Sequence, residues 1–178
     1  MRHLALAALL AACTHAAAPT GGTLPAVPLV ASGDTLRGII GLTGVIPATR
    51  LVIRRNGDGP AIPLSGDTAL LRSVVGLDVR LFGEWSGKGY VVSEFVVRAV
   101  GGVPAIDGEI RFGGSGVLLR NSLAGFRKGA NWIDTFVELR DPPDGLLEHP
   151  SARVWVTLAR DGTVASYGFI PTPPAGPR

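Results

Sequence analysis

The sequence predicts a mostly β protein made of two tandem small antiparallel β-barrels, each with one short helix between its third and fourth strands. Three observations lead there: many turn-forming residues, short apolar runs with a period of two, and an internal repeat at an offset of about 75 residues. The 178-residue chain contains 25 Gly and 14 Pro, which favour tight turns between short strands. A single β-sandwich built from the same strands is the alternative.

The first 12 residues are typical of a signal peptide. A short basic start precedes an unbroken apolar run, Leu4–Leu10, and the only cysteine of the chain follows at position 13. The segment Leu10-Ala11-Ala12-Cys13 resembles a bacterial lipobox. The resemblance implies that the chain is cut before Cys13 and that lipid on this residue anchors the protein to a membrane. An ordinary secretory leader or a short buried helix is the alternative.

The residues that follow the cysteine favour a particular location. Thr14 stands where the inner-membrane retention rule of enteric lipoproteins would want Asp, so the resemblance favours the outer membrane, facing the periplasm, over the inner membrane. Residues 13–32 are predicted to form the lipidated Cys and a flexible spacer, because residues 14–32 are uncharged and rich in Ala, Pro, Gly and Thr. No later stretch approaches the roughly 18 consecutive apolar residues of a membrane-spanning helix.

Residues 33–102 are predicted to form the first barrel. The expected strands are Asp34–Leu42, Arg50–Arg55, Ala61–Leu64, Asp78–Trp85 and Tyr90–Val100. One or two helical turns are expected within Asp67–Val74, where Asp67 is a suitable N-cap. Alternation predicts two sets of residues that each share one face: Val79, Leu81, Gly83 and Trp85 on one strand, and Val91, Ser93, Phe95 and Val97 on the next.

This order of three strands, a short helix and two strands resembles the OB-fold, a five-stranded Greek-key barrel. The resemblance implies that the helix plugs the gap between strands three and four. It also implies a ligand face over strands two and three, where such folds often bind nucleic acids or oligosaccharides.

Residues 103–170 are predicted to repeat the plan as a second barrel. The expected strands are Ala105–Phe112, Gly116–Arg120, Phe136–Leu139, Arg153–Leu158 and Val164–Ile170, with a short helix between Asp141 and Pro150. Residues 121–131 form an insertion without a counterpart in the first barrel. Residues 171–178, rich in Pro, are expected to be a disordered tail.

Charge and aromatic content argue against nucleic acid as the partner. The 17 basic residues, one of which leaves with the leader, are nearly balanced by 14 acidic ones. Arg50, Arg54 and Arg55 on the second strand are candidate partner contacts, but neither that strand nor the next carries an aromatic ring for base stacking.

Trp155 is the other candidate contact. Val154, Val156 and Leu158 alternate onto the expected barrel interior, which turns Trp155 outward. A large exposed ring marks a contact surface, so the ring is expected to pack either against the first barrel or against an external partner.

Two groups are candidates for catalytic residues. Asp107 and Glu109 lie two apart on one strand and share a face, as the paired carboxylates of a glycosidase would, but a solvated face that also carries Arg111 is the preferred interpretation. His149 is better explained as a cation in the last turn of the second helix than as a catalytic base or a metal ligand. No catalytic residue, metal or cofactor is therefore predicted.

The functional expectation is a membrane-anchored envelope lipoprotein that acts as a noncatalytic binding or structural module, with an unknown envelope protein or saccharide as its partner. An envelope hydrolase using His149 or the Asp107/Glu109 pair is the alternative. An accessory subunit of a larger envelope complex also stays open.

Overall fold

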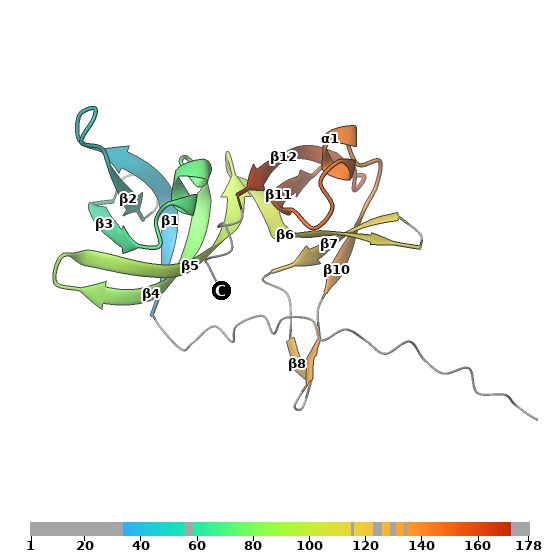
Figure 1. Cartoon of the computed structure of the whole chain (residues 1–178), viewed down its shortest axis with the longest axis horizontal. Coiled ribbons are helices and arrows are strands. Elements are labelled where there is room, and N and C mark those ends of the chain that lie inside the picture. The colour runs from blue at the N-terminus through green and yellow to red at the C-terminus, as the bar shows by residue number, and fades with distance from the viewer. Residues whose placement is uncertain are drawn as a thin grey trace, which may run out of the picture.

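The computed structural model describes residues 34–55, 59–114, 116–122, 126–128, 131–133 and 135–171. The predicted leader, Cys13, the spacer and nearly all of the predicted tail lie outside these residues. The described part is mostly β, which confirms the prediction of a mostly β protein (Figure 1). Its helical elements are one 3₁₀ turn and one short α-helix, and neither is long and apolar enough to cross a membrane.

The first unit contains five strands and the 3₁₀ turn. These are β1 (Asp34–Thr43), β2 (Arg50–Arg54), β3 (Ala61–Gly66), η1 (Leu70–Val74), β4 (Asp78–Ser86) and β5 (Gly89–Val100). Every strand predicted here is present, with bounds that differ by at most two residues.

The pairings of these strands form a circuit. Strand β1 pairs with both β2 and β4, β2 pairs with β3, and β4 pairs with β5, all antiparallel. The circuit is completed by β3 and β5, which run parallel. Each of the five strands therefore bonds to two of the other four.

The face predicted for β4 is correct for its first half. Val79 and Leu81 are fully buried and Gly83 is buried, whereas the Trp85 side chain is 48% exposed near the end of the strand. Its indole contacts the edge of the Tyr90 ring, with 5.4 Å between ring centroids.

The face predicted for β5 is wrong at its start. Tyr90 is fully buried while Val91 is exposed, which is the reverse of the prediction. The reason is a bulge: Phe82 lies opposite Glu94 and Gly83 opposite Val92, so Ser93 has no opposite residue. An extra residue of this kind shifts the alternation. Beyond it, Phe95 and Val97 are buried as expected.

The second unit follows the first along the chain. Its elements are β6 (Val103–Gly113), β7 (Gly116–Asn121), β8 (Phe126–Lys128), β9 (Asn131–Ile133), β10 (Phe136–Leu139), α1 (Asp144–Leu147), β11 (Arg153–Leu158) and β12 (Val164–Ile170). The predicted insertion, residues 121–131, contains β8 and the first residue of β9, and these two strands pair with each other in a separate two-stranded sheet. Their hairpin projects away from the other strands in Figure 1.

The two units share one order of pairing. In the second unit β6 pairs with β7 and β11, β7 with β10, and β11 with β12. A parallel bridge between Arg140, next to β10, and Thr163, next to β12, stands where β3 and β5 pair in the first unit. By this order of pairing, β1 corresponds to β6 and β4 corresponds to β11. The registers place Arg37 opposite Arg80 in the first unit and Asp107 opposite Trp155 in the second, so these positions correspond as well.

Each unit has its own apolar cluster. The first consists of Leu36, Ile40, Leu51, Ile53, Leu71, Val74, Val79, Leu81, Tyr90, Val92, Phe95 and Val97, together with Ile170 of β12. The second consists of Ile110, Val117, Leu119, Leu139, Leu146, Val154 and Val156. Gly101 and Gly102, both with positive φ, form the turn between β5 and β6. The units therefore meet at this turn and where β12 reaches the first cluster.

Candidate functional site

A polar cluster lies at the junction of the two units. Of the residues that the structure describes, Asp107 and Thr157 are the polar ones classed as buried, and Asp107 has no exposed surface at all. Burying a charge is costly unless hydrogen bonds and an opposite charge compensate it. Asp107 therefore needs a complete set of partners.

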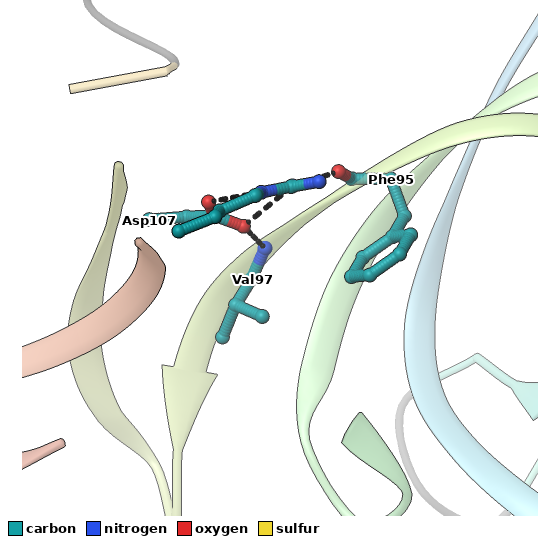
Figure 2. Close-up of polar contacts among 4 residues, drawn as sticks. Phe95, Val97 and Asp107 are labelled. Atoms are coloured by element: carbon teal, nitrogen blue, oxygen red, sulfur yellow. Dashed lines mark hydrogen bonds and ion pairs between the residues drawn. The ribbon is translucent and has the colours of Figure 1, made fainter. Parts of the chain in front are cut away.

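Asp107 obtains these partners from both units, as Figure 2 shows. The Arg153 guanidinium donates through Nε to Oδ1 and through Nη2 to Oδ2, both at 2.9 Å. The backbone N–H of Val97 donates to Oδ2 at 2.8 Å, and Arg153 Nη2 also donates to the carbonyl oxygen of Phe95 at 2.5 Å. The guanidinium lies over the Phe95 ring, 4.8 Å from its centroid.

This ion pair satisfies an open strand edge. In a strand, the carbonyl of one residue and the N–H of the residue two positions later point to the same side. On β5 these groups belong to Phe95 and Val97, and they bond to Arg153 and Asp107 instead of to another strand. The side-chain pair thus stands in for a neighbouring strand and ties β6 and β11 to β5.

The burial of Asp107 raises the pKa of its carboxyl group. The bonds from Arg153 and from the Val97 N–H act in the opposite direction, and desolvation is the larger effect. Such a group, fully engaged and closed to solvent, has no room to act on a substrate.

The sequence interpretation of the β6 face as solvated is wrong for Asp107. Asp107 does point outward from its own unit, as the alternation predicted, but the first unit covers that face. A period of two shows which side of a sheet a residue faces, yet it does not show what lies against that side. The bidentate partner Arg153 is the functional residue that sequence reasoning missed.

Glu109 has separate partners. It accepts a hydrogen bond from Arg111 at 2.8 Å and lies 3.8 Å from Arg120 Nη1. Both carboxylates of the hydrolase alternative are therefore held by arginines, Asp107 without access to solvent and Glu109 on a partly exposed surface.

His149 lies at the surface after α1, next to Pro150. Its ring contacts the edge of the Phe169 ring, with 4.9 Å between centroids. The His149 side chain is exposed, whereas Asp107 is fully buried. The three groups of the hydrolase alternative thus have separate contacts, Asp107 with Arg153, Glu109 with Arg111 and His149 with Phe169.

Trp155 occupies the position that the alternation predicted, on the outer face of β11. Val154 and Val156 on either side are fully buried in the second cluster. The indole is partly buried, packs against the first cluster and lies over Gly168, where a Cβ atom would come within 2.6 Å of the ring. The glycine leaves space for the ring, which then contacts the first unit.

The three arginines of the second strand do not gather into one site. Arg50 and Arg55 are exposed and Arg54 is half-buried. Arg55 lies 5.9 Å from the centroid of the Trp85 ring, so an aromatic side chain of β4 does accompany it. Arg55 also lines a shallow hollow of about 440 Å³ together with Arg37 and Asp78.

No group of three His, Cys, Asp or Glu side chains that could hold a metal occurs within the described ranges. The comparisons supply no relative either: no family model, no curated protein and no solved structure matches this chain. The functional argument therefore depends on the residues themselves.

Proposed function

We propose that this chain is a bacterial envelope lipoprotein, anchored by lipid on Cys13, whose folded part is a noncatalytic binding or structural module. The segment Leu10-Ala11-Ala12-Cys13 supports the anchor, and Thr14 favours the outer membrane, facing the periplasm. One acyl chain gives only reversible binding, whereas the two or three of a lipoprotein hold a protein stably.

We also propose that each unit is an OB-type barrel. The supporting observation is the order of pairing, which is the same in both units and includes one parallel contact at the corresponding place. The 3₁₀ turn and α1 each lie between the third and fourth strands of their unit, where the OB-fold has its helix.

The observation that carries the noncatalytic assignment is the engagement of Asp107. The carboxylate most removed from solvent holds two units together instead of facing a pocket. An envelope protein or a saccharide is the proposed partner, and the exposed surface around Arg55 and Trp85 offers a cation beside an aromatic ring for such a contact.

The anchor is tested by detergent partitioning of the chain expressed in a bacterial host. The Cys13→Ser variant should move from the detergent phase to the aqueous phase, because it lacks the thiol that takes the lipid. Thr14→Ser is the matched control, since it changes the neighbouring residue and keeps the thiol, and it should stay in the detergent phase. Equal partitioning of the wild type and Cys13→Ser would contradict the lipoprotein assignment.

A further inference from the structure

The first unit carries a second version of the ion pair, with the charges exchanged. Arg37 on β1 corresponds to Asp107 on β6, and Asp78 on β4 corresponds to Arg153 on β11. The Arg37 guanidinium donates to Asp78 through Nε to Oδ1 at 3.2 Å and through Nη2 to Oδ2 at 2.7 Å. Both pairs are therefore bidentate and link the corresponding strands.

The two pairs differ in what covers them. Asp107 and Arg153 lie against the β5 edge, whereas 58% of the Arg37 side chain and 23% of the Asp78 side chain are exposed. Arg37, Asp78 and Arg55 line the hollow of about 440 Å³ on this outer face. The face that binds a strand edge in the second unit is thus open in the first.

Strand β12 has a free edge that corresponds to the edge of β5 bound by Asp107 and Arg153. Within the described part of the chain β12 pairs only with β11, and the neighbouring bridge is at Thr163. The N–H of Ile110 donates to the carbonyl of Ala152, so this carbonyl points to β6. By alternation the backbone groups of Val154 and Val156 also point to β6 and away from β12.

Tyr167 and Phe169 lie opposite Val156 and Val154 in the β11–β12 ladder. Because Val154 and Val156 bond to β6 and not to β12, the N–H and C=O groups of Tyr167 and Phe169 point away from β11, to the free side of β12. The same reasoning applied to β5, from the bond of the Ile40 N–H to the Leu77 carbonyl, identifies Phe95 and Val97, where the side-chain pair is found.

We propose that the free edge of β12 in one copy of this chain docks on the outer face of β1 and β4 in a second copy, at the Arg37–Asp78 pair. The contact repeats between chains the one that joins the two units within a chain. Because the charges are exchanged and N–H and C=O groups alternate along a strand edge, the docked pair must lie one backbone group further along β12 than the Asp107–Arg153 pair lies along β5. Asp78 accepts from the N–H of Phe169, and Arg37 donates to its carbonyl.

Side chains on both surfaces fit this contact. Arg153 lies over the ring of Phe95, the residue whose carbonyl it binds, and Phe169 likewise offers Arg37 both a carbonyl and an aromatic ring. Ile39, which lines the hollow, is 39% exposed and Phe169 is 38% exposed, and docking covers both. The two surfaces are different, so the association is head-to-tail and each added copy leaves one of each surface free.

Photo-crosslinking of the full chain tests the proposal. A photoreactive benzoylphenylalanine replaces Ile39, and the products are separated by mass and sequenced. Products of two and three copies are expected, with the probe joined to a peptide from Val164–Ile170. Products that contain a different protein or a different segment of the chain, or the absence of any product, would overturn the second copy as the partner.

Substitutions then test the contribution of the Arg37 side chain. In the probe-carrying chain, Arg37→Glu should lower the yield of the two-copy product about tenfold, as expected for the loss of a charge-assisted hydrogen bond. Lys88→Glu, with the same change of charge in the exposed turn between β4 and β5, is the matched control and should leave the yield unchanged. Equal yields for the two variants would overturn the role of Arg37.

The backbone contact has its own pair of variants on the other surface. Phe169→Ala removes the ring and keeps the N–H, whereas Phe169→Pro removes both, at an edge position where proline is tolerated. The proline variant should give a several-fold lower yield than the alanine variant, with the same circular dichroism spectrum. Equal yields would show that the strand edge does not bind.

Discussion

The two units share an order of strand pairing but differ in how their interiors are completed. The buried residues of the first cluster come from β1, β2, β4, β5 and the 3₁₀ turn of its own unit, together with Ile170 from β12. Strand β3 adds the partly buried Ile62 and Leu64. The second cluster is smaller and receives no buried residue from the first unit. A small core leaves a small margin of stability, so the second unit depends on the first more than the reverse.

The bidentate ion pairs make the same comparison at the level of single residues. Arg37–Asp78 and Arg153–Asp107 have similar geometry on corresponding strands, but one is exposed to water and the other is covered. An exposed pair contributes about 0–1 kcal/mol, whereas removing one partner of a buried pair costs several kcal/mol. The contribution of each ion pair to the free energy of unfolding therefore depends on how far its surroundings exclude water.

The strongest test of this comparison separates the units. A fragment of residues 33–102 should unfold cooperatively, with a free energy of unfolding of a few kcal/mol. A fragment of residues 103–171 should show no cooperative transition, because Asp107 and Arg153 lose the β5 edge. Urea titration followed by circular dichroism measures both. If neither fragment folds while the whole chain does, the two units form one cooperative structure, and the comparison fails.

The next effect concerns the carboxylates. Asp107→Ala should lower the free energy of unfolding of the whole chain by about 3 kcal/mol, since it leaves the Arg153 guanidinium and the Val97 N–H without their acceptor. The matched variant Asp78→Ala, at the corresponding ion pair, should cost less than about 1 kcal/mol. Similar losses in urea denaturation would show that coverage does not decide the difference.

The smallest of the three effects concerns the corresponding positions Trp155 and Arg80. Trp155→Ala should cost about 2–3 kcal/mol, at or below the usual range for a core Trp because the ring is only partly buried. Arg80→Ala should cost about 0.5 kcal/mol or less, as is usual for a surface residue. Thermal unfolding of both variants checks this, and a loss below about 1 kcal/mol for Trp155→Ala would mean that the ring stabilises something other than the junction.

Much of the fold could be predicted because local rules decide it. Turn residues and alternation located every strand of the first unit and every strand of the second except β8 and β9. The buried pair Val154 and Val156 follows from a period of two on β11. The face of β5 could not be predicted from its own residues, because the bulge at Ser93 arises from the register with β4. A bulge depends on two strands at once.

The candidate site was less predictable for a related reason. The sequence showed that Asp107 and Trp155 face outward from their unit, and the structure places them there. Strand β5 covers Asp107 and the first apolar cluster covers Trp155, and no pattern within β6 or β11 describes those surfaces. The repeat itself held the missing signal, since aligning Arg37 with Asp107 and Asp78 with Arg153 pairs two opposite charges in each unit.

The position of β1 determines how the folded part responds to mechanical force. The chain enters the first unit at Asp34, the start of a strand that is bonded on one side to β4 and on the other to β2. These hydrogen bonds are perpendicular to the strand, so tension along β1 loads the two ladders in shear and does not peel their bonds apart one at a time. A pull applied through the N-terminal segment therefore acts on the strand whose displacement requires both ladders to break together.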